Sequence, residues 1–324
     1  MSDNINSEGL LNSVLEKYYK EESNYDYLVF FSGGKDSTYL AHTLKKMKGG
    51  RVCLFTVDNG LEGENFHEHL AQVADSLKCD LYVYKPKDGF YKLFNLIIRE
   101  KAFMDIDTNP ICFFCNHYFM GLGIEFAEKN NIPVIVHGFT PSQLNIPSTL
   151  SIENSMEKGY MRNMEVFDAF RKKNFQEIYR KVRETKAYKD DDDFKKMMDK
   201  IFYVSNKVNL VYAFQYLGYN VERIKSTIID ELGWVNPVIN ETNENYISSG
   251  CRMWDIFLLM EKKIPGFMLH ERKEFSNDVQ KGSLSKQTYD YVMKMADDYT
   301  SDLQVSPEVE KFIEKVGFAD LLLK

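Results

Sequence analysis

The stretch Tyr25–Ser37, YDYLVFFSGGKDS, decides the fold of this 324-residue chain. The apolar run that ends at Phe31 shows no alternation, which predicts a strand buried on both faces, as in a parallel sheet. The segment Ser37–Lys48, STYLAHTLKKMK, predicts a helix that Gly49 and Gly50 end. Between strand and helix, two glycines let the backbone turn sharply and present its N–H groups, and the helix N-terminus adds donors and its dipole. The stretch therefore predicts an anion-binding loop.

The side chains of this loop suit a nucleotide phosphate accompanied by a metal ion. Ser32, Ser37 and Thr38 can donate hydroxyl hydrogen bonds, and Lys35 can balance phosphate charge as a point cation. Asp36 cannot hold phosphate directly, but its carboxylate suits a bridging Mg²⁺. The pattern is neither GxxxxGK(S/T) nor GxGxxG. The alternative interpretation is a plain Gly-Gly turn with an Asp or Ser cap on the helix.

Strands and helices alternate over the first half of the chain. Further strands are expected at residues 51–57, 80–86 and 133–138, and helices at 7–22, 63–78, 90–103 and 116–130. This alternation predicts βαβ units with right-handed crossovers and a parallel sheet. The pattern stops near residue 148, and later helices are expected at 165–204, 207–234, 252–263 and 285–298. We therefore predict an α/β fold with a nucleotide-binding domain over 1–148. A mostly helical region over 149–324 would serve the substrate or oligomerisation.

The charge and cysteine counts exclude several classes of protein. Lys and Arg number 41 against 48 Asp and Glu, a net charge of −7. This balance argues against a protein that coats nucleic acid, because backbone binding needs clustered positive charge. Five cysteines are too few, and odd in number, for a disulfide scaffold. No apolar run approaches a membrane span, and the first twenty residues lack the features of a signal peptide. We expect a soluble cytoplasmic protein with reduced thiols.

Placed after an apolar strand, Ser32–Ser37 resembles the PP-loop signature of the ATP pyrophosphatase superfamily, which has the adenine nucleotide α-hydrolase fold. Members cut ATP between the α and β phosphates, adenylate a substrate oxygen, and let nitrogen or sulfur displace AMP. The resemblance implies that Lys35 and Asp36 are catalytic. It also implies nucleotide or Mg²⁺ contacts for Ser32, Gly33, Gly34, Lys35, Asp36, Ser37, Thr38, Thr56, Val57, Asp58 and Gly138. The last four stand at the ends of two expected strands, where ligands of parallel sheets bind.

Cys112 and Cys115 form a CxxC just before an expected helix, whose N-terminus would lower their pKa values and favour thiolates. Three interpretations stay open: metal or cluster ligands, a redox or sulfur-carrying pair, and buried structural thiols. With Cys251, the pair resembles the three-cysteine set of PP-loop thiolation enzymes, in which three thiolates hold a [4Fe–4S] cluster. A Zn²⁺ site with a fourth ligand such as His117 would use the same residues.

A second resemblance concerns Ile111–Gln143, ICFFCNHYFMGLGIEFAEKNNIPVIVHGFTPSQ. It is similar to the corresponding stretch of N-acetyl sugar amidotransferases, where CxxC is followed by a helix, an Ile-Pro strand and Gly-x-x-x-Ser-Gln-like residues. Residues 214–237 and 272–287 resemble later parts of these enzymes, although the last of them departs from the family's Arg-Glu. The segment His137–Gln143 lacks the acidic pair that tRNA-thiolation enzymes usually carry after the fourth strand.

We predict an enzyme that uses ATP and Mg²⁺ to adenylate an oxygen of a small-molecule substrate for replacement by nitrogen. No glutaminase motif is visible, so ammonia would come from a separate glutaminase or from solution. The alternative is a sulfurtransferase with an iron–sulfur cluster on the three cysteines, a sulfur-donor protein, and tRNA or a small molecule as acceptor. A nucleotide sensor without turnover is less favoured, because it would not need both Lys35 and Asp36. No membrane partner is expected, and a homo-oligomer is compatible with the helical region.

Five further features carry open alternatives. His137 could contact ATP or be a satisfied core histidine, and Trp234 could stack on a substrate or pack in the core. Arg252 and Arg272 could bind a carboxylate or phosphate, or lie on the surface. Asp190–Asp193 is expected to be a solvated turn rather than a metal site.

Overall fold

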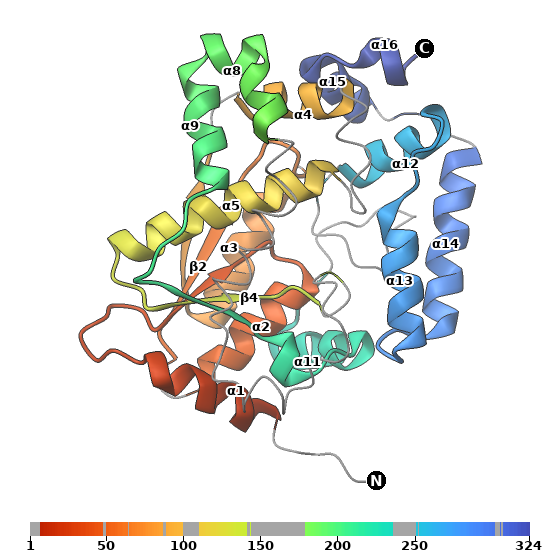
Figure 1. Ribbon diagram of the computed structural model, residues 1–324. Coiled ribbons are helices and arrows are strands. Elements are labelled where there is room, and N and C mark those ends of the chain that lie inside the picture. The colour runs from red at the N-terminus through yellow and green to blue at the C-terminus, as the bar shows by residue number, and fades with distance from the viewer. Residues whose placement is uncertain are drawn as a thin grey trace.

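The computed structural model describes residues 7–47, 50–63, 65–86, 89–99, 110–140, 143, 179–235, 251, 253–301, 305 and 307–324. Within these ranges, five parallel strands form one sheet that lies between two layers of helices (Figure 1). The strands are β1 (Tyr27–Phe30), β2 (Val52–Val57), β3 (Asp80–Tyr84), β4 (Val134–His137) and β5 (Asn209–Tyr212), and their order is β3-β2-β1-β4-β5. The α/β class predicted from the sequence is confirmed.

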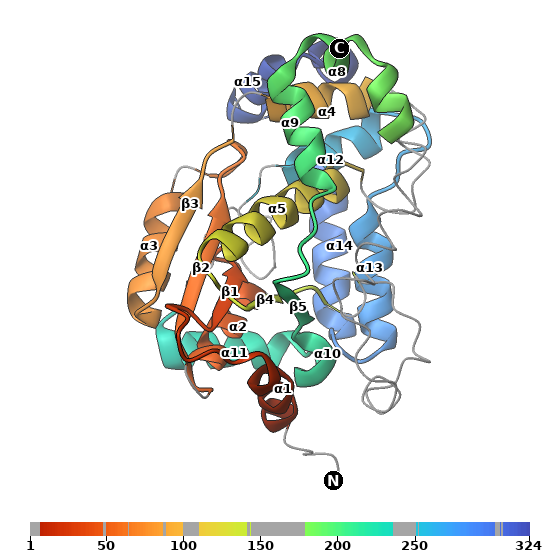
Figure 2. The same ribbon diagram turned by 60° about the vertical axis from the view of Figure 1, so that its left-hand side comes forward.

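Alternate residues of the central strands face opposite helix layers, which explains why these strands are apolar throughout. Leu28 and Ile135 pack on one side, and Val29 and Val136 pack on the other. The first layer contains α4 (Gly89–Arg99), α5 (Pro110–Lys129) and α9 (Asp192–Ile201). The second contains α1 (Ser7–Leu15), α2 (Lys35–Lys45), α3 (Phe66–Leu77), α10 (Phe214–Leu217) and α11 (Val221–Leu232). Figure 2 shows these two layers from the side.

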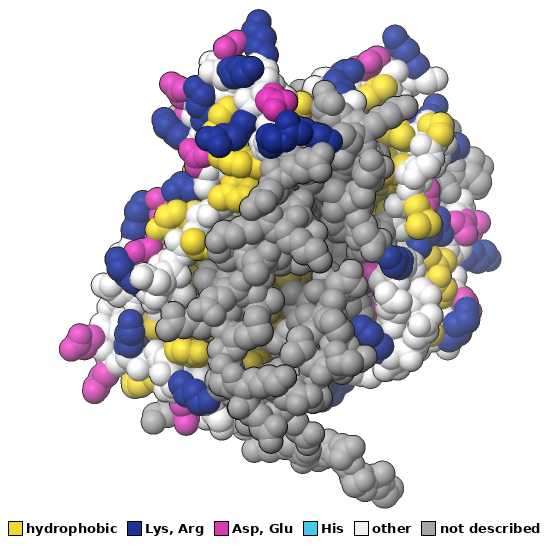
Figure 3. All heavy atoms as spheres, in the orientation of Figure 1, with side chains coloured by type: hydrophobic (Ala, Val, Ile, Leu, Met, Phe, Trp, Pro, Cys, Tyr) yellow, Lys and Arg dark blue, Asp and Glu magenta, His cyan; other side chains and the backbone are white. Residues whose placement is uncertain are grey.

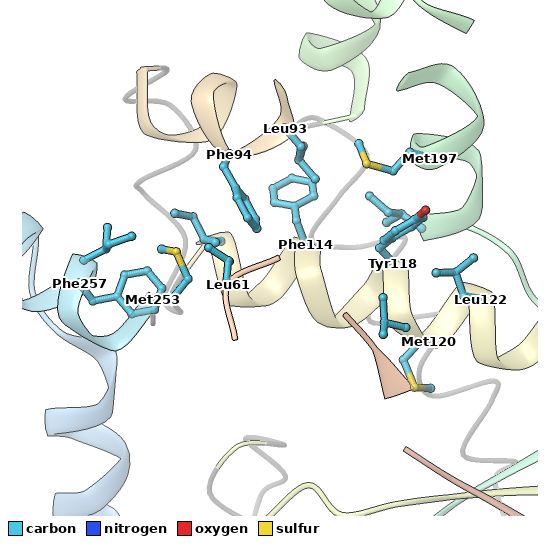
Figure 4. Packing of buried hydrophobic residues seen from close by; sticks show 14 of the residues in the cluster. Leu61, Leu93, Phe94, Phe114, Tyr118, Met120, Leu122, Met197, Met253 and Phe257 are labelled. Atoms are coloured by element: carbon cyan, nitrogen blue, oxygen red, sulfur yellow. The ribbon is translucent and has the colours of Figure 1, made fainter. Parts of the chain in front are cut away.

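The last part of the chain extends the first layer and adds a helix pair beside it. Its helices are α12 (Met253–Lys263), α13 (His270–Gln280), α14 (Lys286–Ser301), α15 (Pro307–Val316) and α16 (Ala319–Leu322). Figure 4 shows Met253 and Phe257 of α12 in one cluster with Phe94 of α4 and Phe114 of α5. Helices α13 and α14 lie side by side (Figures 1 and 2) and pack on Val221 of α11 through a small separate cluster.

The parallel sheet does not stop near residue 148, because β5 pairs with β4 in parallel. The expectation of helix throughout 207–234 is therefore wrong at Asn209–Tyr212, where four residues complete the sheet edge. Their strand conformation depends on pairing with a segment more than seventy residues earlier, which local pattern does not reveal. The division into domains at residue 148 stays a prediction.

Three further comparisons with the expected elements concern the helices. Helix α5 begins at Pro110 rather than near residue 116, since proline suits the first turn of a helix. Asp191 separates α8 (Lys186–Asp190) from α9, and its carboxylate caps α9 by accepting the Phe194 N–H. This cap agrees with the structural interpretation of Asp190–Asp193. Arg252 lies outside the described residues. Among the described helices, none combines the length and apolar character that crossing a membrane requires.

Helices α5 and α9 approach so closely at Gly121 that the position has no room for a side chain. A Cβ atom there would lie 1.8 Å from the backbone oxygen of Lys200. We expect Gly121→Ala to force the two helices apart and to lower the free energy of unfolding by about 1–3 kcal/mol. Urea unfolding of the variant and of Lys129→Ala, an exposed control on the same helix, would measure this. Equal midpoints for the two variants would contradict the close approach.

Candidate active site

The strand order reverses between β1 and β4, and the candidate site lies at the carboxyl ends of these two strands. In parallel α/β sheets, ligands bind in the crevice at such a reversal. The loop Ser32–Gly34 follows β1, and Gly138 follows β4. A Cβ atom on Gly138 would lie 3.9 Å from the backbone carbonyl carbon of Asp36. The structure therefore brings together the predicted phosphate loop and the predicted contact residue of β4.

The loop exposes the N-terminus of α2 in a conformation that requires glycine. Gly33 has φ +73°, and a Cβ atom there would lie 2.8 Å from the His69 Cδ2 atom. Gly34 is the N-cap of α2, so the N–H groups of Lys35, Asp36 and Ser37 have no acceptor within the helix. Three successive unpaired donors at a helix N-terminus form a binding site for an anion.

Hydroxyl groups hold this loop from inside. The Ser32 and Ser37 hydroxyl oxygens lie 3.3 Å apart, and the Ser32 oxygen also accepts the Gly34 N–H at 3.4 Å. The Thr56 hydroxyl, from the end of β2, donates to the carbonyl oxygen of Phe31. Thr56 thus fixes the residue that precedes the loop, which gives it a structural contact in addition to the expected nucleotide one.

The carbonyl oxygen of Gly33 accepts hydrogen bonds from three segments of the chain. His69 of α3 approaches with Nε2 at 2.8 Å, Trp234 donates from Nε1 at 3.0 Å, and the Thr38 hydroxyl donates at 3.4 Å. Burial lowers the pKa of His69, although the bond to the Gly33 carbonyl acts in the opposite direction. A neutral His69 protonated at Nε2 fits this acceptor. Trp234 is buried, so it serves the loop backbone and the core.

Lys35 and Asp36 form a compact ion pair at the start of α2. The Lys35 Nζ atom donates to Asp36 Oδ2 at 2.5 Å and to the Tyr219 hydroxyl at 3.0 Å, and Lys35 is 3% exposed. Asp36 Oδ1 is buried without a hydrogen-bond partner among the described residues. A buried carboxylate oxygen without a partner fits a ligand of Mg²⁺, the ion that the PP-loop resemblance implies. Lys225 of α11 lies near this pair, and burial first and the charge of Lys35 second lower its pKa.

At the end of β2, the carboxylate of Asp58 already has hydrogen-bond and ion-pair partners. Asp58 accepts the Gly60 N–H at 2.9 Å, and its Oδ2 lies 2.9 Å from His67 Nε2 and 3.1 Å from Lys85 Nζ. Burial acts to raise the pKa of Asp58, but these three partners outweigh it and lower the pKa. Val57 beside it is buried. Asp58 is therefore an anion held in place at the end of β2, a strand that pairs with β1.

The three predicted cysteines lie close enough together to act on one another's pKa values. Cys112 and Cys115 lie one turn apart inside α5, and Cys251 forms an antiparallel bridge with Glu62. Asn59 donates to Cys115 Sγ at 3.7 Å and also bonds Cys251. Of the side chains that the structure describes, no three His, Cys, Asp or Glu residues are arranged to hold a metal ion. The thiols are grouped, and the cluster and Zn²⁺ interpretations of these cysteines stay predictions.

Burial acts against the thiolates that the sequence predicts at this position. Burial raises the pKa of Cys112, Cys115 and Cys251, and neighbouring acidic groups, Glu271 for Cys112 and Glu62 for the other two, raise it further. Cys112 is exposed to solvent, yet enough protein surrounds it to disfavour its charged form. Loss of hydration outweighs the helix dipole, because the dipole effect is small and confined to the first turn.

Two of the open alternatives are resolved by contacts within the fold. His137 is buried against Phe30, Phe139 and Tyr212, its Nδ1 atom accepts the Phe139 N–H at 3.1 Å, and burial lowers its pKa to about 3. It is a neutral core histidine. Arg272 binds both carboxylate oxygens of Glu261 and also Asp297, so it joins α12, α13 and α14.

One group near the site was not anticipated from the sequence. Glu271, Glu274 and Asp278 lie on one face of α13 at i, i+3 and i+7 spacing. Burial first, and neighbouring acids second, raise the pKa of Glu274 to about 8, and Lys35 and Asp36 are among the charges that act on it. The signal was available as acidic residues at helical spacing, but only the fold shows that they face inward.

The face drawn in Figure 3 and one cavity elsewhere in the fold show no second anion-binding site among the described residues. Basic and acidic side chains are interspersed over the described parts of the face in Figure 3. A cavity of about 470 Å³ lies at the opposite end of the sheet, lined by Lys45, Arg51 and Cys79 among others. Its arginine is already paired with Asp26, so the cavity presents no free anion-binding fork.

The bond from Trp234 to Gly33 predicts a link between the end of α11 and nucleotide affinity. Trp234→Phe removes the donor and keeps an aromatic ring. We expect a loss of about 1–2 kcal/mol in the free energy of unfolding and weaker ATP binding, because the loop carbonyl loses one of its donors. Equilibrium dialysis with Mg²⁺ and ATP measures the affinity. The half-buried Trp254→Phe is the matched control, and equal ATP affinities in both variants would disprove the link.

The buried neutral His137 predicts a pH dependence of stability. Its pKa is about 3 in the folded chain, against roughly 6.5 when unfolded. The unfolded chain therefore binds more protons below pH 6.5, and the stability present above that pH is lost as the pH falls. Between pH 7.5 and 5.5, the wild type should lose about 1.4 kcal/mol more than His137→Asn, which keeps an acceptor for Phe139. Denaturant unfolding at both pH values tests this, with the exposed His67→Asn as control.

The sequence matches no protein-family model and no curated protein sequence. In structure, the chain is similar to the U34-tRNA thiolase NcsA from Methanococcus maripaludis with its [4Fe–4S] cluster, at 12% identity and TM-score 0.42 over 94% of this chain and 82% of that one. It is also similar to NMN synthetase from Francisella tularensis (9% identity, TM-score 0.43, 95% and 99%). A third similarity is to the NH₃-dependent NAD synthetase from Campylobacter jejuni (14%, 0.35, 62% and 94%). Scores this low carry no argument about activity, so the assignment rests on the sheet order and the loop.

Proposed function

We propose that this chain is an ATP-dependent enzyme that forms AMP and pyrophosphate while it adenylates an oxygen of a small-molecule substrate. The observation that carries the proposal is the loop Ser32–Ser37, which presents a helix N-terminus, a buried lysine and a carboxylate at the strand-order reversal. A phosphate chain needs donors and cations, and its metal ion needs an oxygen ligand without another partner. This loop supplies all three.

The proposed chemistry uses the loop for positioning and for charge. The N–H groups of Lys35, Asp36 and Ser37 would bind the β and γ phosphates, and Lys35 would exchange its bond to Asp36 for one to phosphate. Asp36 would hold Mg²⁺, which neutralises phosphate charge when bound. The substrate oxygen attacks the α phosphorus and pyrophosphate leaves. The site would favour this displacement by holding the attacking oxygen and the leaving pyrophosphate in line with the phosphorus.

Nitrogen transfer is the finer form of the proposal. The resemblance of Ile111–Gln143 to N-acetyl sugar amidotransferases supports an acetamido group as the acceptor. The amide oxygen would take the adenylyl group, ammonia would add to the same carbon, and AMP would leave with that oxygen. The net charge of −7 and the interspersed surface charges fit a small substrate better than a nucleic acid.

Sulfur transfer is the second candidate, and the grouping of Cys112, Cys115 and Cys251 is the observation that favours it. Metal and sulfide content after anaerobic purification separates the two. A brown protein that loses iron in Cys251→Ser would support sulfur transfer. A colourless protein whose turnover requires ammonium and survives Cys251→Ser would support nitrogen transfer.

The loop residues give the direct test of the coarser proposal. We expect the purified protein to release pyrophosphate from ATP when Mg²⁺, ammonium and N-acetylated sugar nucleotides are present. Lys35→Ala and Asp36→Asn should lower this rate at least a hundredfold, because each removes charge from the phosphate site, while unfolding stays cooperative. The exposed Lys46→Ala and Asp75→Asn are matched controls and should retain the wild-type rate. Full activity in Lys35→Ala would contradict the assigned site.

A further inference from the structure

Helix α13 turns three acidic side chains toward the interior, and two of them, Glu271 and Glu274, form no ion pair with the described residues. Asp278 is 3% exposed and Glu274 is 8% exposed. Glu274 makes no hydrogen bond or ion pair with the part of the chain that the structure describes, and Glu271 Oε2 is buried without a partner there. Carboxylates buried to this degree are normally paired, because an unpaired buried charge is strongly disfavoured.

An arginine of the same helix forms ion pairs with carboxylates of the neighbouring helices α12 and α14. Arg272 lies between Glu271 and Lys273 in sequence and binds Glu261 and Asp297. An arginine is thus available on α13, but it turns away from Glu271 and Glu274. The inward carboxylates are therefore not part of the ion pairs that join α13 to its neighbouring helices.

The inward-facing acids of α13 lie near two parts of the candidate site, the cysteines and the phosphate loop. Glu271 acts on Cys112 and on Glu274, and Glu274 in turn is acted on by Lys35 and Asp36 of the phosphate loop. From Glu271 to Asp278 the helix rises about 10 Å, at about 1.5 Å per residue. Glu271 therefore lies near the cysteines, and Glu274, one turn later, lies near the loop that would hold ATP.

Burial favours the neutral form of Glu274, and a cation bound beside it would favour the charged form; the arrangement favours a small monovalent cation. Bound ATP would add several negative charges beside Glu274, which makes a compensating cation more necessary. Within the described ranges, these carboxylates do not converge with other ligands as a metal site would. A row of carboxylates along a helix suits a cation that needs only two or three hydrogen-bond acceptors.

We propose that Glu271 and Glu274 bind the ammonium ion that supplies nitrogen to the adenylated substrate. This inference rests on nitrogen transfer as the proposed function and adds the site of the second substrate. Ammonium donates N–H bonds to the two carboxylates and passes one proton to a carboxylate. The resulting ammonia attacks the adenylated carbon with its lone pair, and the C–O bond to AMP breaks.

A structural test uses thallium(I), which has the charge and nearly the size of ammonium and scatters anomalously. Crystals of the full chain soaked in thallium(I) acetate should show an anomalous peak between Glu271 and Glu274. Glu274→Gln should lose the peak, and Glu314→Gln, an exposed control on α15, should keep it. No peak in the wild type, or a peak there for Mn²⁺ but not for thallium(I), would overturn the proposal.

A kinetic test separates this inference from the proposed function. Exchange of labelled pyrophosphate into ATP needs only adenylation, whereas product formation also needs ammonium. Glu274→Gln and Glu271→Gln should each raise the KM for ammonium at least tenfold and change the KM for ATP in exchange less than twofold. Unchanged ammonium KM values in both folded variants would overturn the ammonium site. Absence of substrate-dependent exchange in the wild type would instead overturn the proposed function, and a KM for methylammonium below that for ammonium would overturn ammonium as the ligand.

If Glu274→Gln fails to fold, Glu271→Gln carries the test alone. Glu271 is less buried than Glu274 and lies near the start of α13, so its substitution perturbs the packing less. A tenfold rise in the KM for ammonium in this variant supports the proposal, and a change of less than twofold contradicts it.

Discussion

The carbonyl oxygen of Gly33 accepts hydrogen bonds from His69, Thr38 and Trp234, and the shape of the phosphate loop depends on these three donors. With a positive φ, the glycine turns its carbonyl inward, toward α3 and the end of α11. The N–H groups of the following residues are then left at the open end of α2, where an anion can reach them. The Gly33 carbonyl thus faces the buried side chains that hold the loop, whereas the N–H groups of Lys35, Asp36 and Ser37 face the anion site.

Desolvation governs the rest of the site. It keeps His69 and His137 neutral, and it raises the pKa of all three grouped cysteines and of Glu274 on α13. Lys35 is buried as well, and Asp36 and Tyr219 accept its hydrogen bonds. The site is therefore arranged around charges that are buried and only partly compensated, as expected where charged ligands enter.

The sequence predicts the loop and the central strands well, because both depend on local features. The buried strand, the two glycines and the helix after them occur within Tyr25–Ser37 and need no distant partner to be recognised. The strand β5 could not be found this way, since its four residues become a strand only beside β4. Helix α13 was missed because its polar sequence buries acids instead of an apolar stripe. The role of Trp234 was hidden by the 201 residues between it and Gly33.

The same limit applies to the protonation of the cysteines. The pair Cys112 and Cys115 does lie in the first turns of a helix, which favours thiolates, but burial has the larger effect. Burial is a property of the folded chain and cannot be read from the spacing of a CxxC. The grouping with Cys251, in contrast, was anticipated from the sequence and is present in the fold through the bridge to Glu62.

The central claim is that this loop directs cleavage of ATP between its α and β phosphates. Turnover with ATP labelled at the α or the γ phosphorus tests it most directly, with the acceptor and ammonium present. The account predicts that the α label appears only in AMP, or in an adenylated intermediate, and the γ label only in pyrophosphate. Appearance of ADP, with the γ label in orthophosphate or in the product, would contradict it.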